Sequence, residues 1–163
     1  MSVQSRRTFV TAGIGSVLAL GSSLPRGFGQ DEPERPPALP GEQVFEFVRI
    51  AHRDLAGTRE MLEDQPGLLN ATWDWGGGDF ETALGGASHM GNREVAGYLL
   101  DNGARLDLFC AATMDMLDVV RAVIDVYPAA IGWKGPHGIP LLRHAEMGEA
   151  AQVLEYLTSK AGA

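Results

Sequence analysis

The side chains best suited to chemistry in this sequence are four histidines and one cysteine. The histidines are His52, His89, His137 and His144, and their spacing along the chain matches no compact metal-ligand motif. We therefore expect structural or surface histidines and no metal site. Cys110 lies in the apolar run LDLFCAA, which holds no cationic neighbour that would activate a thiolate. We expect Cys110 to be a small buried hydrophobe, and a lone cysteine excludes an internal disulfide framework.

The common catalytic sequence motifs are missing from the chain. It contains no Gly-rich phosphate loop, no G-x-S-x-G elbow and no H-E-x-x-H. The run Gly76-Gly77-Gly78 lacks the strand-to-helix setting that a phosphate cradle needs. We therefore predict that the protein is not an enzyme and uses no cofactor.

Two aromatic, glycine-containing segments are candidates for contact with a partner. The first is WDWGGGD, from Trp73 to Asp79, and the second is WKGPH, from Trp133 to His137. Large aromatics on exposed turns often dominate binding energy, although the indoles could instead fold down and cover the ends of neighbouring helices. The candidate contact residues are Trp73, Trp75, Asp79, His89, Trp133 and His137.

The first 29 residues have the layout of an export signal. A basic start is followed by a weakly apolar stretch, and Gly27 and Gly29 precede the expected cleavage site. Arg6, Arg7 and Phe9 lie in the run SRRTFV, which resembles a twin-arginine (Tat) signal and implies export of a folded protein to the periplasm or beyond. An uncleaved anchor or a disordered basic tail is the alternative. Residues 30–41 are then a Pro-rich spacer.

The charge of the mature part narrows the class of partner. The whole chain carries a net charge of −8, and removal of the leader, with its three arginines and no acid, lowers this to −11. Such a body repels nucleic acid and anionic membrane surfaces. We predict a protein partner, no nucleic acid and no stable membrane insertion after cleavage.

Short segments whose apolar residues recur at helical spacing occur in pairs from residue 42 to residue 160. One pair is predicted over residues 82–90 and 92–101, with Gly91 in the turn and Gly103 just past the end. The same apolar pattern recurs 24 residues later and again near the C-terminus, and an earlier copy begins at Val44. The pattern predicts four helix pairs.

The best copy, from Thr82 to Ala104, resembles the ankyrin repeat in its T-x-L, central glycine, E-V and L-L elements. Gly85 stands where the family has a histidine, so the usual histidine–threonine hydrogen bond is lost, although the Thr82 hydroxyl can still cap its helix. The resemblance implies an all-α solenoid of about four helix-turn-helix repeats over residues 42–160. The connector between repeats two and three is shortened, and Asp107 is the expected N-cap that follows it.

An open solenoid of this kind offers a concave binding face and no closed reaction chamber. The first functional hypothesis is therefore an exported interaction module that binds a protein partner on its concave face, which is lined by the fingers, that is, the long connectors between repeats. The alternative is a small-ligand or metal-binding accessory protein that uses the Trp and His residues of the long connectors. An enclosed site that joins two histidines and an acid would favour the alternative.

Overall fold

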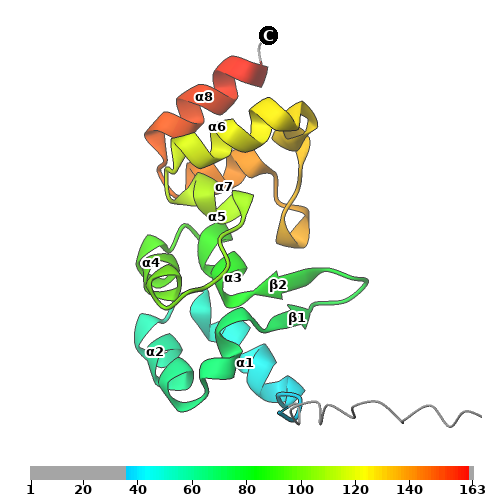
Figure 1. Cartoon of the computed structure of the whole chain (residues 1–163), viewed down its shortest axis with the longest axis vertical. Coiled ribbons are helices and arrows are strands. Elements are labelled where there is room, and N and C mark those ends of the chain that lie inside the picture. The colour runs from blue at the N-terminus through cyan, green and yellow to red at the C-terminus, as the bar shows by residue number, and fades with distance from the viewer. Residues whose placement is uncertain (1–35, 162–163) are drawn as a thin grey trace, which may run out of the picture. The chain divides into compact units, whose positions relative to one another are not determined.

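The computed structural model describes residues 36–161 of the chain, and residues 37–161 form one compact body of helices (Figure 1). The predicted leader, with Arg6, Arg7 and Phe9, and the first part of the predicted spacer lie outside the described residues. The described part is mostly helical, as predicted, and adds one two-stranded sheet. None of its helices is both long enough and apolar enough to span a bilayer.

Within residues 36–161, eight α-helices follow one another as four pairs. In each pair a tight turn separates the first helix from the second, and the first helices contact one another in file, from α1 through α3 and α5 to α7. The pairs are α1 (Gly41–Ala51) with α2 (Leu55–Asp64), α3 (Ala83–His89) with α4 (Arg93–Asp101), α5 (Leu108–Thr113) with α6 (Leu117–Val126), and α7 (Leu141–Met147) with α8 (Ala151–Ala161).

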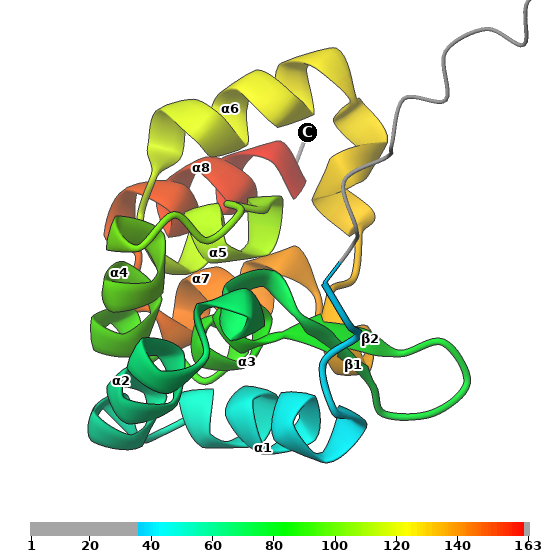
Figure 2. The same ribbon diagram turned by 60° about the horizontal axis from the view of Figure 1, so that its bottom comes forward.

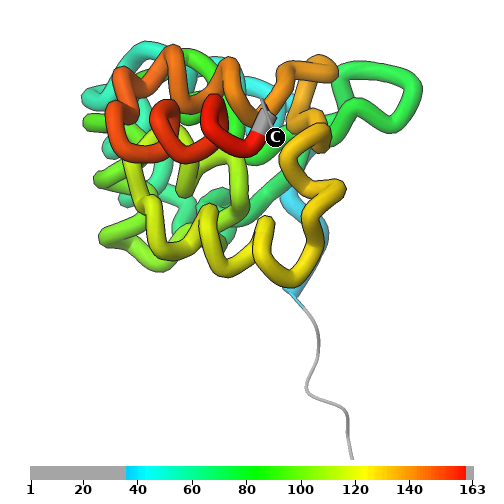
Figure 3. Tube along the Cα trace, turned by 90° about the horizontal axis from the view of Figure 1, so that it is seen from above, coloured from blue at the N-terminus to red at the C-terminus, as the bar shows by residue number. Residues whose placement is uncertain are grey.

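The connectors between pairs are long, short and long, as the sequence predicted. The first contains η1 (Pro66–Asn70), β1 (Thr72–Asp74) and β2 (Phe80–Thr82), and the last contains η2 (Pro128–Gly132) and η3 (Pro136–Gly138). Strands β1 and β2 pair antiparallel, and their hairpin extends beyond the stacked helices (Figures 2 and 3). The segment before α7 lies beside this hairpin, where the Asp79 side chain meets η3.

The predicted helix starts are confirmed by their capping hydrogen bonds. The Thr82 hydroxyl accepts the Gly85 amide N–H at 3.1 Å, and the Asp107 carboxylate accepts the Cys110 amide N–H at 2.7 Å. Gly91, in the turn between α3 and α4, has a φ of 69°, which glycine adopts without strain. These local signals fix where the second and third pairs begin.

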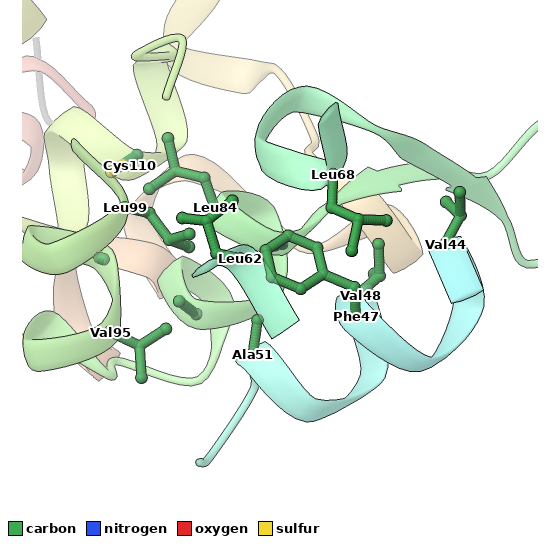
Figure 4. Packing of buried hydrophobic residues seen from close by; sticks show 13 residues of the cluster. Val44, Phe47, Val48, Ala51, Leu62, Leu68, Leu84, Val95, Leu99 and Cys110 are labelled. Atoms are coloured by element: carbon green, nitrogen blue, oxygen red, sulfur yellow. The ribbon is translucent and has the colours of Figure 1, made fainter. Parts of the chain in front are cut away.

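The apolar stripe of α1 shows how helical spacing builds the core. Val44, Phe47, Val48 and Ala51 recur at helical intervals and are all buried. They pack with Leu62, Leu68, Leu84, Val95 and Leu99 from the next elements (Figure 4). A second buried cluster joins α5 to α8. The ends of α1 and α3 and the base of the hairpin therefore sit on a packed support.

Candidate metal centre

Glu81 is a carboxylate buried at the base of the hairpin. It lies opposite Trp73 in the β1–β2 register, and only 1% of the residue is exposed. The Trp75 indole N–H donates to Glu81 Oε2 at 2.8 Å, whereas Oε1 is fully buried and accepts no hydrogen bond of good geometry from residues 36–161. A buried charge costs several kcal/mol unless it is compensated, so this carboxylate requires cationic or donor partners.

His52 directly follows α1 and points one ring nitrogen at this carboxylate. Its Nδ1 lies 2.8 Å from the Val48 carbonyl oxygen, and because a carbonyl can only accept, Nδ1 carries the proton. In the neutral ring Nε2 then keeps its lone pair, and this atom lies 3.4 Å from Glu81 Oε2.

His89 is the last residue of α3 and brings a second imidazole to the same point. Its Nε2 lies 3.0 Å from Glu81 Oε1 and 3.1 Å from His52 Nε2. Two imidazole nitrogens with lone pairs repel one another at this distance unless a proton or a cation lies between them.

His137 supplies a third imidazole from the connector before α7. Its Nδ1 lies 2.8 Å from Asp79 Oδ2, and its backbone N–H donates to Asp79 Oδ1, also at 2.8 Å. His137 Nε2 faces Glu81 Oε2 at 3.5 Å. His137 has a φ of 58°, a left-handed conformation that is uncommon for residues other than glycine, and Asp79 holds it there.

The four side chains together have the dimensions of a metal-ligand set. One ligand atom from each of His52, Glu81, His89 and His137 lies within 4.8 Å of all the others. A tetrahedral ion with bonds of about 2.0–2.1 Å separates its ligand atoms by about 3.3 Å. Four contacts in the cluster, one to Glu81 Oε1, two to Glu81 Oε2 and one between His52 and His89, measure 3.0, 3.4, 3.5 and 3.1 Å and lie near that value. A single proton can bridge one pair of these atoms, whereas a metal ion can accept a lone pair from all four.

In two of the three imidazoles, a hydrogen-bond partner of the Nδ1 atom orients the ring. A backbone carbonyl holds His52 Nδ1, and a carboxylate holds His137 Nδ1, so both Nε2 atoms face the Glu81 carboxylate. Metal-binding histidines commonly donate their other N–H to such partners, which fix the tautomer and raise ligand basicity. The arrangement therefore matches a metal centre in its outer contacts as well as in its ligands.

Two consecutive glycines in α3 make the room for this cluster. A Cβ on Gly86 would lie 2.7 Å from His52 Cε1 and Nδ1, and a Cβ on Gly85 would lie 3.3 Å from Glu81 Cγ. Glycine inside a helix costs about 1 kcal/mol relative to alanine, so this pair weakens a short helix. The space that the glycines leave is occupied by the two ligand side chains.

The Glu81 carboxylate is buried, and neighbouring hydrogen-bond donors favour its ionised form. Burial alone would raise the pKa of Glu81, but His52, His89 and Trp75 outweigh it and lower the pKa to about 2. Burial alone would lower the pKa of His52, but contacts with Glu81 and the Val48 carbonyl outweigh it and raise the pKa. Glu81 is thus ionised at neutral pH and ready to bind a cation.

The structure brings together some of the residues predicted for a partner surface and separates others. His89, Asp79, His137 and Trp75 all belong to the cluster or contact it. Trp73 is half-buried and packs on the Phe45 ring at 5.2 Å between centroids, which is the alternative foreseen for the indoles.

Trp133 and His144 lie outside the cluster. Trp133 is 46% exposed and lies beside Tyr127 on the last connector. His144 is buried in α7 against the Phe109 ring, as expected of a structural histidine. Cys110 is also buried, as predicted, and burial raises its pKa to about 11.

The convergence of His52, Glu81, His89 and His137 was not predicted from the sequence, whose histidine spacing indicated no metal site. Glu81 was not among the candidate residues. A usable signal was present, because His52 and His89 fall at the ends of the first helices of two adjacent pairs, which stacking places side by side. The glycine at position 85, noted only as a departure from the ankyrin pattern, was a second signal.

Comparison with known proteins adds no relative from which a role could be transferred. No protein-family model matches the chain, and no curated protein or solved structure matches it significantly.

Proposed function

We propose that this protein binds a divalent first-row transition-metal ion through His52, Glu81, His89 and His137. The observation that carries the proposal is the convergence of one ligand atom from each of these residues within 4.8 Å, around a carboxylate that is 1% exposed. The proposal develops the alternative sequence hypothesis of a metal-binding accessory protein.

The donor set selects the class of ion. Three imidazoles and one carboxylate suit Zn²⁺, Cu²⁺, Ni²⁺ and Co²⁺, whereas Mg²⁺ and Ca²⁺ prefer sites made of oxygen ligands. Four protein ligands fill a tetrahedral shell, which is the pattern of sites that hold an ion rather than hydrolyse a substrate. We therefore propose metal binding without turnover.

The proposed scaffold is an ankyrin-like solenoid exported through a Tat-type signal. The serial contacts of α1, α3, α5 and α7, and the Thr82 and Asp107 caps, support the repeat assignment. The proposed location is the periplasm or the exterior. Because Tat export carries folded proteins, an ion could be bound before export.

Metal titration of the full chain tests the proposal. Tag-free protein is stripped with EDTA, dialysed, and titrated with Zn²⁺, Ni²⁺ or Mg²⁺ by calorimetry and by tryptophan fluorescence. Because the Trp75 N–H bonds to a ligand carboxylate, its emission should report occupancy. We expect one Zn²⁺ or Ni²⁺ per chain and no measurable Mg²⁺ binding.

Two matched glutamate variants sharpen the test. Glu81→Gln keeps the side-chain shape and removes the charge, and should weaken Zn²⁺ binding by at least 10–100-fold. Glu146→Gln changes an exposed glutamate on α7 that pairs with Arg143, and it should leave the affinity unchanged. Zn²⁺ binding that survives Glu81→Gln intact would refute the assignment.

A protein partner remains the second proposed function, and exposed apolar side chains at the far connector favour it. Val126 is 71% exposed and Tyr127 62%, and Trp133 lies beside Tyr127. Exposed aromatics of this kind are typical binding anchors. Capture of a partner from an extract by the wild-type chain, and its loss with Trp133→Ala and Tyr127→Ala, would support this function; equal capture by the variants would exclude this patch.

A further inference from the structure

The two carboxylate oxygens of Glu81 both border the imidazoles, but they face different rings. Oε1 lies 3.0 Å from His89 Nε2, whereas Oε2 lies 3.4 Å from His52 Nε2 and 3.5 Å from His137 Nε2. A carboxylate can give a metal ion one oxygen or both. The group that fixes the orientation of this carboxylate therefore decides how many ligand atoms Glu81 supplies.

Trp75 is the residue that distinguishes the two oxygens. Its indole N–H donates to Oε2 at 2.8 Å, whereas Oε1 is fully buried and accepts no hydrogen bond of good geometry from residues 36–161. The hydrogen bond occupies a lone pair of Oε2 and weakens this oxygen as an electron-pair donor. Oε1 keeps its lone pairs and carries the desolvation cost of a buried acceptor without a partner. An ion bound at Oε1 would remove that cost.

The hairpin tip holds the backbone of Trp75 in place. Asp74 Oδ1 accepts the amide N–H groups of Gly76 and Gly78 at 2.8 and 3.2 Å, and the Trp75 backbone N–H donates to the Asp79 carbonyl oxygen at 2.9 Å. These short-range bonds close the turn directly after β1. The indole therefore leaves the hairpin from a fixed point.

Three rings surround the Trp75 indole. The ring centroids of Phe45, His137 and His52 lie 5.6, 5.7 and 6.3 Å from that of Trp75. Two of these rings belong to proposed metal ligands, so the indole packs against the site itself. Its N–H is thus directed at Glu81 by the same side chains that would hold the ion.

We propose that Trp75 sets the ion selectivity of the metal site by limiting Glu81 to one ligand oxygen, Oε1. The inference rests on the proposed metal site. Three imidazole nitrogens and one oxygen give four ligands, and the filled d shell of Zn²⁺ imposes no preference against a tetrahedron. Ni²⁺ favours tetragonal arrangements, so the same constraint lowers its affinity relative to that of Zn²⁺.

The visible spectrum of bound Co²⁺ tests the number of ligands without any variant. Co²⁺ binds the ligand types that Zn²⁺ binds, and its visible bands are intense in tetrahedral sites and much weaker with five or six ligands. The full chain is stripped with EDTA, dialysed and titrated with Co²⁺ to saturation. We expect intense bands of the tetrahedral type. Weak bands at full occupancy would overturn the proposal.

Two tryptophan variants isolate the indole N–H. Trp75→Phe keeps an aromatic ring and removes the donor, so the Glu81 carboxylate is free to give both oxygens. We expect weaker visible bands at saturating Co²⁺ and a Zn²⁺ affinity about 10–100-fold lower by calorimetry. The loss of Ni²⁺ affinity should be smaller, because the second oxygen suits an ion that favours more ligands.

Trp73→Phe is the matched control for the loss of an indole from the hairpin. Trp73 packs on the same Phe45 ring, at 5.2 Å between centroids, and within residues 36–161 no hydrogen bond joins its indole to Glu81. Its Co²⁺ spectrum and its ratio of Zn²⁺ to Ni²⁺ affinity should equal those of the wild type. Urea unfolding of the metal-free variants shows whether each one folds.

The failures of the two proposals are distinguishable. If the wild type takes up no Co²⁺, the metal function itself is wrong. If Trp75→Phe binds Co²⁺ with the wild-type spectrum and loses Zn²⁺ and Ni²⁺ affinity equally, the metal site stands and Trp75 contributes packing alone, which overturns the proposal. If Trp75→Phe does not fold, the wild-type Co²⁺ spectrum decides.

Discussion

Asp79 and His137 lie 58 residues apart in the chain, yet one carboxylate binds both the ring and the backbone of that histidine. Oδ2 lies 2.8 Å from His137 Nδ1, and Oδ1 accepts the His137 backbone N–H at 2.8 Å. The loop of the β1–β2 hairpin thereby fixes the ring orientation of a residue on the last connector. Metal-binding histidines commonly donate their other N–H to such a carboxylate, which fixes the tautomer of the ring.

Replacing Asp79 should therefore weaken metal binding although Asp79 is not a ligand. We expect Asp79→Asn to lower Zn²⁺ affinity by about 10–100-fold, because the ring loses its orienting charge. Asp118→Asn, at an exposed position on α6, is the matched control. Calorimetric titration of both variants measures the difference, and equal affinities would show that Asp79 has no orienting role.

Gly86 should be required for the site and not for the fold. In Gly86→Ala the new Cβ would lie 2.7 Å from His52 Cε1 and Nδ1, so the ring must move. We expect at least a tenfold loss of Zn²⁺ affinity, since His52 is then misplaced. A general effect of alanine in a helix would instead favour stability by up to about 1 kcal/mol.

Gly97→Ala controls for that helix effect. Gly97 lies in α4, where a Cβ would meet only Met114 Cε, at 4.0 Å. We expect a gain of about 0.5–1 kcal/mol in the free energy of unfolding and unchanged Zn²⁺ affinity. Metal titration and urea unfolding of both variants give the comparison, and unchanged affinity in Gly86→Ala would count against the placement of His52.

The helix pairs could be predicted from the sequence because their signals are local. Apolar spacing located the helices, and Thr82, Asp107 and Gly91 marked their ends through short-range capping and turn geometry. The unequal connectors were visible as unequal spacings between copies of one pattern. Each of these inferences needs only residues a few positions apart.

The metal cluster could not be predicted in the same way because its members meet only through tertiary packing. Glu81 points inward because of the β1–β2 register, and strands of three residues next to a glycine tip carry little periodic signal. His137 joins the cluster because Asp79 reaches across to it. Neither relation leaves a regular spacing in the chain.

The Cys110 thiol should be unreactive in the folded protein. It is buried, and burial raises its pKa to about 11, so almost no thiolate exists at pH 8. We expect a disulfide exchange reagent to label it at least 100-fold more slowly in buffer than in denaturing urea. Rapid labelling of the native chain would mean that the α3–α5 interface opens readily.

Ionisation of Glu81 should stabilise the metal-free protein at neutral pH. Its folded pKa of about 2 lies below the ordinary value of 4.5, so the unfolded state binds the proton more tightly. The stabilisation is therefore fully present above about pH 4.5 and is lost as the pH falls toward 2, with a magnitude on the order of 2–3 kcal/mol.

The measurement is urea unfolding in EDTA at several pH values, for the wild type and for Glu81→Gln. Other carboxylates titrate in the same range, so the difference between the two proteins is the informative quantity. The advantage of the wild type should shrink as the pH falls from 4.5 to 2. A constant difference would show that Glu81 has an ordinary pKa.

Metal should stabilise the fold as a whole, because the four ligands come from four separate places in the chain. His52 follows α1, Glu81 lies in β2, His89 ends α3 and His137 lies in η3. An ion that binds only the folded state at 100 times its Kd adds about 2.7 kcal/mol to the free energy of unfolding. For a body of this size the Tm should rise by roughly 5–15 °C. Calorimetry with Zn²⁺ and with Mg²⁺ provides the measurement and its control.

Hydrogen exchange should show where that stabilisation acts. Amides of residues 72–82 and 133–140 should gain protection on Zn²⁺ addition, because the ion links the β1–β2 hairpin and the last connector to α1 and α3. Amides of α6 and α8, which lie away from the cluster, should change only as far as global stability changes. Zn²⁺ that binds with full stoichiometry but protects neither segment would mean that the ion is held without joining these elements.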